Sequence, residues 1–132
     1  MGHDGTTSSR ELNAAGREFF GPEWLGVFAS DQIPPAPARG RSFALVNLDT
    51  SSGRGTHWTA RYTENGTRMY YDSFARRVSQ ILPHVQGAVD TDTRASVLDQ
   101  NRVGAGYQSC GQRSIAALLV ARDTGTRGFM QM

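Results

Sequence analysis

The chain has 132 residues, of which 38% are hydrophobic, and these values fit one globular domain. No apolar run approaches the roughly 18 residues of a membrane span, and the first residues lack the apolar core of a signal peptide, so we expect neither a membrane protein nor a classically secreted one. The formal net charge is +2, and every cation is a scattered arginine, which predicts at most a weak association with DNA.

The first regular element is predicted to be a helix. Residues 1–7 are expected to form a disordered tail and residues 8–132 a single domain. Ser8 and Glu11 form a capping-box pattern, which predicts that the helix begins at Ser8, and Gly21-Pro22 is expected to end it. The apolar face of this helix is predicted to carry Leu12, Ala15 and Phe19.

The middle of the chain is predicted to form strands. Residues 42–48 are apolar at nearly every position, which is typical of a strand buried on both faces. Residues 57–64 and 67–72 flank Asn65-Gly66, a dipeptide that strongly favours a two-residue hairpin turn. We therefore expect a buried strand followed by a β-hairpin.

Helices and one short strand are expected after the hairpin. Residues 76–82 are predicted to be helical and residues 96–100 to form a short strand, followed by a glycine-bearing loop over 101–108. Ser109 is a suitable N-cap for a helix that runs to about Arg122. This order of helices and strands predicts an α+β fold.

The register of the hairpin predicts a pair of interacting side chains. A two-residue turn at Asn65-Gly66 pairs Ala60 with Tyr71 and makes His57 and Asp72 diagonal neighbours on one face, about 7–8 Å apart at the backbone. A carboxylate that accepts the Nδ1 proton of a histidine orients the imidazole as a general base. We therefore expect Asp72 to orient His57.

The single cysteine completes a set of groups for acyl transfer. Because Cys110 is the single cysteine of the sequence, we expect neither an intramolecular disulfide nor a cysteine-based zinc site. Cys110 stands where a helix is predicted to begin, so the helix dipole and backbone N–H groups favour its thiolate, and its own N–H is a candidate oxyanion donor. Gly111 would let a substrate carbonyl approach the main chain. With His57 and Asp72, Cys110 supplies a base, an orienting acid and a nucleophile.

Short motifs around these residues point to a family. They are Gly55-Thr56-His57-Trp58, Tyr71-Asp72-Ser73-Phe74 and Ser109-Cys110-Gly111 before an apolar helix. Together they resemble adenain, the maturation protease of adenoviruses, with relatives in polinton-like viruses and among the SUMO/ubiquitin-like proteases. The resemblance covers about residues 19–121. It implies a papain-like fold with a central mixed sheet, a β-hairpin, flanking helices and a nucleophile at a helix N-terminus.

The same resemblance implies roles for individual residues. It makes His57 the base, Asp72 its orienting acid and Cys110 the nucleophile, and it calls for an upstream glutamine whose amide completes the oxyanion hole. Gln100 is preferred, because the loop between Gln100 and Ser109 is long enough to fold back over the Cys110 thiol. Gln108 is only two residues before Cys110 and leaves the capping turn along with the nucleophile. The usual gap in the family is shorter than the gap between Gln100 and Cys110.

Substrate-binding residues are also implied. Trp24 and Trp58 are predicted mainly as core residues that can also wall a narrow cleft with Gly111, and the family cleaves after small residues with glycine before the scissile bond. Two further features depart from the family: Ala75 stands where a glycine normally follows Asp-Ser-Phe, and the chain lacks the second cysteine that attaches an activating peptide in adenoviral enzymes.

These expectations combine into one functional hypothesis. The chain is predicted to be a cysteine endopeptidase that matures virion precursor proteins, with polypeptide substrates, no cofactor, no metal and no membrane. It is expected in a reducing intracellular compartment, in the infected host cell and the virion. Three alternatives stay open: a deconjugating protease for ubiquitin-like modifiers, an acyltransferase with the same three residues, and a catalytically inactive binding module.

Overall fold

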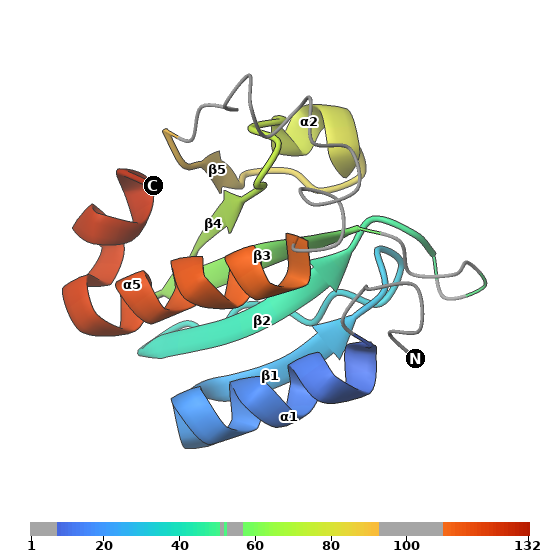
Figure 1. The fold of residues 1–132 in the computed structure, drawn as a ribbon. Coiled ribbons are helices and arrows are strands. Elements are labelled where there is room, and N and C mark those ends of the chain that lie inside the picture. The colour runs from blue at the N-terminus through green and yellow to red at the C-terminus, as the bar shows by residue number, and fades with distance from the viewer. Residues whose placement is uncertain (1–7, 51, 53–56, 93–109) are drawn as a thin grey trace.

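The computed structural model describes residues 8–50, 52, 57–92 and 110–132. Its centre is one mixed five-stranded sheet in the order β1-β2-β3-β4-β5, with helices beside it, so the fold is α+β as predicted (Figure 1). The strands are β1 (Trp24–Phe28), β2 (Arg41–Asn47), β3 (Trp58–Glu64), β4 (Thr67–Tyr71) and β5 (Val89–Asp90). The helices are α1 (Ser9–Phe20), the 3-10 turn η1 (Gly21–Glu23), α2 (Val78–Ile81) and α5 (Cys110–Met130).

The hairpin of β3 and β4 has the predicted register. Ala60 pairs with Tyr71 and Glu64 with Thr67, and both turn residues, Asn65 and Gly66, have positive φ. That combination is the type I′ turn that an Asn-Gly pair favours, because its twist matches that of the flanking strands. The turn thereby determines which residues of the two strands face each other.

Two edge strands were not expected from the sequence. β1 pairs with β2 and β5 pairs with β4, both in parallel, whereas the central pairs are antiparallel. β1 contains Gly26 with φ 133° and an irregular register beside Trp24, which weakens the sequence pattern of a strand. β5 has only two residues, too few for a pattern to be visible.

Helix α1 begins with the predicted capping box but buries a different face. The Ser8 hydroxyl accepts the Glu11 N–H, and the Glu11 carboxylate accepts the Ser8 N–H. The prediction that Phe19 lies on the apolar face is wrong, since its exposed fraction is 42%. The buried residues are Leu12, Gly16 and Phe20. Their spacing of four residues leaves a groove at Gly16 that the indole of Trp24 fills.

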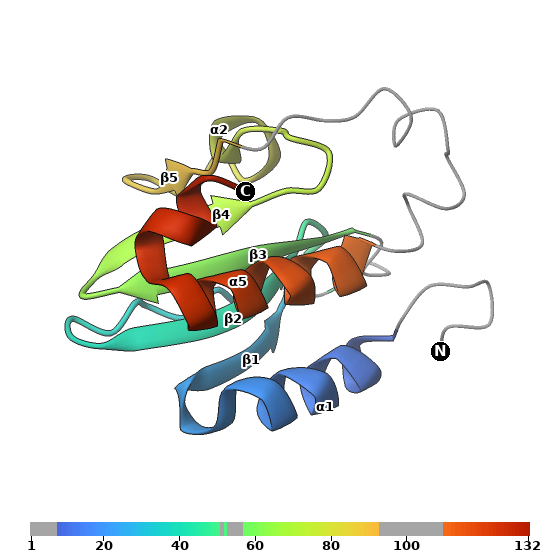
Figure 2. The ribbon, with the colours of Figure 1, turned by 60° about the vertical axis from the view of Figure 1, so that its left-hand side comes forward.

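Both faces of the sheet are covered. Helices α1 and α5 pack on one face, where the main core contains Phe43, Leu45, Ala60, Tyr62 and Leu118 (Figure 2). A smaller core on the opposite face contains Val46, Tyr70, Val78 and Leu82. β2 is buried on both faces as predicted.

Helix α5 extends beyond its predicted end. Gly125 has φ 72° and interrupts the helix close to the predicted stop, but helical turns continue to Met130. The ring of Phe129 then packs on Tyr62, with the two centroids 5.5 Å apart. The strand and loop predicted over 96–108 lie outside the described residues. Within the described part of the chain, each helix is too short or too polar to cross a membrane.

Substitution of Gly16 by alanine is expected to destabilise the protein, although alanine is the better helix former by about 1 kcal/mol. A Cβ at this position would lie 2.2 Å from the Trp24 indole, which is buried and hydrogen-bonded to Asn13. We expect the free energy of unfolding to fall by about 1–3 kcal/mol, the usual effect of overpacking. Urea denaturation measures this change, and a more stable Gly16→Ala variant would contradict the packing described.

Candidate active site

His57 and Asp72 lie side by side at one end of the hairpin. His57 immediately precedes β3 and Asp72 immediately follows β4, so the register of the turn places them diagonally across the two strands. The His57 Nε2 and Asp72 Oδ1 atoms are 2.5 Å apart, and both side chains are buried. The expected pairing of the two residues is therefore present in the structure.

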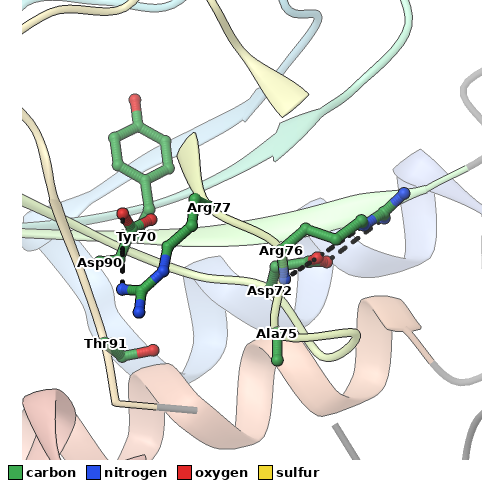
Figure 3. A pocket seen from close by; sticks show the side chains of 7 residues that line it. All are labelled: Tyr70, Asp72, Ala75, Arg76, Arg77, Asp90 and Thr91. Carbon is green, nitrogen blue, oxygen red and sulfur yellow. Dashed lines mark hydrogen bonds and ion pairs between the residues drawn. The ribbon is translucent and has the colours of Figure 1, made fainter. Parts of the chain in front are cut away.

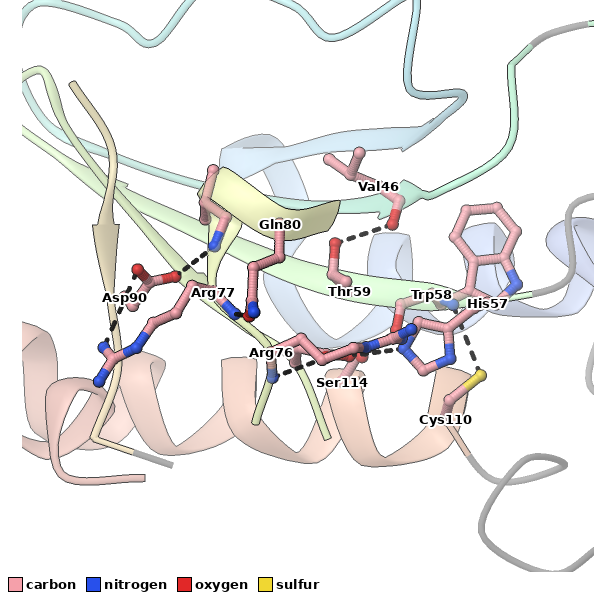
Figure 4. A network of polar contacts seen from close by, with 12 residues as sticks. Val46, His57, Trp58, Thr59, Arg76, Arg77, Gln80, Asp90, Cys110 and Ser114 are labelled. Carbon is pink, nitrogen blue, oxygen red and sulfur yellow. Dashed lines mark hydrogen bonds and ion pairs between the residues drawn. The ribbon is translucent and has the colours of Figure 1, made fainter. Parts of the chain in front are cut away.

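The ring nitrogen that contacts Asp72 differs from the one expected. The expectation that the Nδ1 proton is donated to Asp72 is wrong, because Nε2 makes the contact. Nε2 is the nitrogen farther from the backbone, and it spans the diagonal distance between the strands. The Nδ1 atom is buried without a hydrogen-bond partner and lies on the side of the Cys110 sulfur (Figure 4).

Asp72 is held by a second cation that sequence reasoning did not assign to the site. Arg76 donates both its backbone N–H and its Nε–H to Asp72 Oδ2, at 3.0 and 2.8 Å. Burial of the carboxyl favours its neutral form, but the hydrogen bonds and positive charges of His57 and Arg76 outweigh this effect and lower the pKa of Asp72 to about 2. The spacing of four residues between Asp72 and Arg76 was the available signal.

A tight turn after β4 brings Arg76 back to Asp72. The Ala75 N–H donates to the Asp72 carbonyl at 2.8 Å, and Ala75 has φ 59°, a conformation that glycine adopts more easily. The ring of Phe74 lies against His57, with centroids 5.0 Å apart, and the Arg76 guanidinium lies 5.3 Å from the centre of the same ring. The turn thus orients the imidazole by stacking as well as by its hydrogen bond.

A small polar pocket adjoins Asp72 and the start of α2 (Figure 3). Its volume is about 10 Å³, close to the minimum that one water molecule needs. Asp90 Oδ1 accepts the Val78 N–H at 2.8 Å, and Arg77 lies 4.0 Å from Asp90 Oδ2. These contacts anchor α2 and β5 beside the turn that carries Arg76.

Cys110 is the first residue of α5, as predicted, and it faces the start of β3. The Trp58 N–H points to Cys110 Sγ at 3.5 Å, and one helical turn later the Ser114 hydroxyl donates to the Trp58 carbonyl at 3.2 Å (Figure 4). Both polar groups of the Trp58 backbone therefore bind α5. The role of Ser114 was not identified from the sequence.

The electrostatic environment favours a charged pair of Cys110 and His57. Burial alone would raise the pKa of the Cys110 thiol, but the interaction with His57 and the N–H groups of Trp58 and Gly111 lower the pKa of the thiol below its ordinary value. Burial would likewise lower the pKa of His57, but Asp72 and Cys110 raise the pKa of the imidazole above its ordinary value. Both shifts move the proton from sulfur towards His57 Nδ1.

The structure gives packing reasons for two of the three residues predicted to bind substrate. A Cβ at Gly111 would lie 2.8 Å from Leu12 and 3.3 Å from Trp58, so the glycine allows α5 to approach α1 and β3. Trp58 is buried in the main core and contacts Cys110 through its backbone. The proposed contacts of Gly111 and Trp58 with substrate stay predictions.

Trp24 lies at a different part of the sheet. It pairs with Phe43, which pairs with Tyr62, four residues along β3 from Trp58, or about 13 Å at ordinary strand spacing. Its ring stacks on Phe20, with centroids 5.7 Å apart. This position accounts for Trp24 as a core residue and gives no support to its predicted role as a wall of the substrate cleft.

The remaining predicted site residues lie outside the described residues. Gln100, Gln108 and Ser109 belong to this group, so the assignment of the oxyanion amide stays a prediction, while the N–H of Cys110 stands at the start of a helix as expected. Among residues 8–50, 52, 57–92 and 110–132, no three His, Cys, Asp or Glu side chains are grouped so that they could hold a metal ion.

The chain was also compared with known proteins. A scan against protein-family models and a search of curated protein sequences found no match. The interpretation of the site therefore depends on its geometry and on the short motifs that the sequence contains.

Replacement of Arg76 by glutamine is expected to raise the pKa of Asp72 above about 2, because one of its two cationic partners is lost. The pKa of Asp72 is lower in the folded protein than in the unfolded chain. Its interaction with Arg76 therefore stabilises the fold fully above about pH 4, and this stabilisation is lost as the pH falls towards 2. The loss at neutral pH should be about 1 kcal/mol, because the guanidinium is partly exposed and screened.

Carboxyl NMR titration and urea denaturation measure these two effects. Arg77→Gln is the matched control, since the Arg77 side chain is largely exposed and pairs with Asp90 instead. An Asp72 pKa that is equal in both variants would show that Arg76 does not act on the carboxylate.

Alkylation of Cys110 by iodoacetamide is expected to continue to lower pH than that of an ordinary thiol, because the pKa of Cys110 is lowered. His57→Gln removes the main interaction that lowers this pKa. The alkylation rate at pH 6, divided by the rate at high pH, should then fall, because a smaller fraction of Cys110 is thiolate at pH 6 when its pKa is higher. His84→Gln is the control, because His84 is exposed and binds the Ser30 carbonyl. Equal pH profiles for the two variants would exclude the His57–Cys110 interaction.

Proposed function

We propose that this protein is a cysteine peptidase in which Cys110 is the nucleophile, His57 the general base and acid, and Asp72 the orienting group. The observation that carries the proposal is the position of the His57 ring. Its Nε2 is hydrogen-bonded to the buried Asp72 carboxylate, and its Nδ1 lies on the side of a cysteine at a helix N-terminus. This arrangement suits nucleophilic acyl transfer.

The proposed reaction uses these groups in two steps. The Cys110 thiolate attacks the carbonyl carbon of the scissile peptide bond, and the resulting oxyanion accepts a hydrogen bond from the Cys110 N–H. His57 Nδ1–H gives its proton to the leaving amine as the C–N bond breaks, which leaves an acyl thioester on the enzyme. His57 then takes a proton from water, the hydroxide displaces the thiolate, and the carboxylic acid product leaves.

Asp72 and Arg76 have distinct parts in this scheme. Asp72 holds the Nε2 proton, so the imidazole presents Nδ1 to the thiol in every step. Arg76 keeps Asp72 ionised, because it lowers the pKa of the carboxyl. A neutral Asp72 could donate a proton to Nε2 and favour the wrong tautomer, which is the physical reason for a permanent cation at this position.

The finer proposal is a papain-like peptidase of the adenain type that matures virion precursor proteins in an infected cell. It is supported by the sequence motifs around His57, Asp72 and Cys110 and by the position of Cys110 at the start of α5. Ala75 adds a detail: the position where the family has glycine adopts positive φ here. The substrate preference, glycine before the scissile bond, follows from the same resemblance.

A peptide library with either glycine or leucine before the scissile bond tests the proposal. We expect cleavage after glycine, poor cleavage after leucine, no cleavage by Cys110→Ala, and a loss of about 100-fold or more in turnover for Asp72→Asn, because the amide can stabilise the wrong imidazole tautomer. His84→Gln should keep the activity of the unmodified protein. Mass spectrometry of the products locates each cleaved bond.

Other outcomes of the same experiment favour the alternatives. Reaction of Cys110 with a ubiquitin-like vinyl sulfone, without cleavage of the library, would favour a deconjugating protease. Acetyl transfer from acetyl-CoA through Cys110 would favour an acyltransferase. No turnover, together with alkylation of Cys110 at the rate of an ordinary thiol, would contradict any catalytic role and leave a binding module.

A further inference from the structure

A buried serine near the start of α5 bonds to a strand rather than to its own helix. Ser114 has an exposed fraction of 0%, and its hydroxyl donates to the Trp58 carbonyl of β3 at 3.2 Å (Figure 4). A serine or threonine within a helix commonly faces solvent or bonds the carbonyl four residues before it. Thr124 of α5 does the latter, since its hydroxyl donates to the Val120 carbonyl at 2.6 Å. Ser114 instead connects two elements of the fold.

A hydroxyl at a fully buried helix position carries a cost that alanine would avoid. Alanine is the better helix former, and a buried hydroxyl is costly unless it makes a hydrogen bond. The buried neighbours Ile115, Ala117 and Leu118 of α5 pack into the main core through apolar groups. Burial of apolar surface is non-directional, so it does not by itself fix the rotation of a helix. The hydrogen bond of Ser114 supplies a directional contact at this point.

The residue of β3 that accepts this hydrogen bond lies beyond the end of β4. The His57 carbonyl bonds the residue that follows β2, so the backbone groups of Trp58, the next residue, point to the opposite edge of the strand. Along that edge Ala60 pairs with Tyr71, the last residue of β4. The position opposite Trp58 would be two residues further, outside the strand. The edge-facing N–H and carbonyl of Trp58 are therefore open to other partners, and α5 supplies one for each.

The two contacts of Trp58 with α5 act together on the sulfur. Cys110 and Ser114 are four residues apart, so their side chains lie on one face of the helix. The Trp58 N–H points to Cys110 Sγ at 3.5 Å, and the Trp58 carbonyl accepts the Ser114 hydroxyl. One contact alone would let the first turn of α5 rotate about it, whereas two contacts to one residue hold the sulfur relative to β3. His57 directly precedes Trp58, so the same contacts set the position of the sulfur relative to the imidazole.

We propose that Ser114 is a positioning residue for the nucleophile, because its hydrogen bond to the Trp58 carbonyl holds the Trp58 N–H at the Cys110 sulfur. This inference rests on the proposed role of Cys110 as the nucleophile. The Trp58 N–H is one of the groups that lower the pKa of the Cys110 thiol, so Ser114 acts on the thiolate through Trp58. Ser114 is fully buried and does not contact the substrate itself.

Alkylation of Cys110 by iodoacetamide over a range of pH tests this role in the full-length protein without any need for peptidase activity. In Ser114→Ala, the rate at pH 6 divided by the rate at high pH should be lower than in the unmodified protein. The reason is that a less well positioned Trp58 N–H stabilises the thiolate less, so the pKa of Cys110 rises. His57, whose charge also acts on the sulfur, is retained in this variant. Ser114→Thr keeps a hydroxyl and should restore the profile.

Thr59→Val is the matched control. Thr59 is the next residue of β3, it is equally buried, and its hydroxyl donates to the Val46 carbonyl of β2 at 2.9 Å. This variant therefore also loses a buried hydrogen bond from a hydroxyl to a carbonyl, but one that does not involve α5. Urea denaturation should show a similar loss of stability in Thr59→Val and Ser114→Ala. The alkylation profile should change only in Ser114→Ala.

Steady-state kinetics with a cleaved peptide from the glycine library give a second readout. Ser114→Ala should lower kcat about fivefold, the factor that corresponds to one ordinary hydrogen bond. KM should be unchanged, because Ser114 does not contact the substrate. Thr59→Val should keep kcat, and Ser114→Thr should recover most of the loss.

The outcomes separate this inference from the proposed function. An alkylation profile of Ser114→Ala equal to that of Thr59→Val would overturn the role of Ser114, even if peptides are cleaved. A Ser114→Thr variant that folds and keeps the profile of Ser114→Ala would overturn it as well. An altered profile in Ser114→Ala without peptide cleavage by the unmodified protein would support the action of Ser114 on the thiolate and contradict the peptidase. If Ser114→Thr does not fold, the comparison of Ser114→Ala with Thr59→Val decides alone.

Discussion

The hydrogen bond between His57 and Asp72 depends on a turn at the opposite end of the hairpin. Asn65 and Gly66 both adopt positive φ, and the resulting two-residue turn allows one register for β3 and β4. A slip by one residue would move His57 and Asp72 to opposite faces of the ribbon. The turn therefore controls the geometry of a site that it does not touch.

A second constraint joins this hairpin to the helix that carries the cysteine. The backbone of Trp58 donates to Cys110 and accepts from Ser114, so α5 is aligned with the first residue of β3, next to His57. The absence of a side chain at Gly111 permits this close approach. Asp72, His57 and Cys110 thus come from three segments whose relative positions are set by backbone contacts, which suits the preorganisation that catalysis requires.

Local patterns in the sequence predicted the hairpin, the buried strand β2, the start of α1 and the start of α5, because turn residues, hydrophobic periodicity and helix caps act over a few residues. The pairing of His57 with Asp72 followed from the hairpin register. The face of α1 was predicted wrongly, since Gly16 looks like a weak helix residue until Trp24 is known to fill its groove. Partners distant in the sequence decide such contacts.

Other features of the site were also not predicted, because they depend on the folded geometry of the chain. Whether Nε2 or Nδ1 contacts Asp72 depends on the distance between two strands. The contact of Arg76 with Asp72 depends on the positive φ of Ala75, a conformation that is not expected for a residue other than glycine. Sequence patterns thus predicted which residues lie close together better than which of their atoms are in contact.

In the proposed mechanism, His57 contacts Asp72 through its Nε2 atom and Cys110 through its Nδ1 atom. Nitrogen-15 NMR of the His57 ring over a pH titration tests it most directly, because the two ring nitrogens give separate signals. The account predicts that Nε2 keeps its proton while Nδ1 titrates, with a His57 pKa that is raised above its ordinary value and falls in Cys110→Ala. Loss of the Nε2 proton on titration, or a His57 pKa that is ordinary and unchanged in Cys110→Ala, would contradict it.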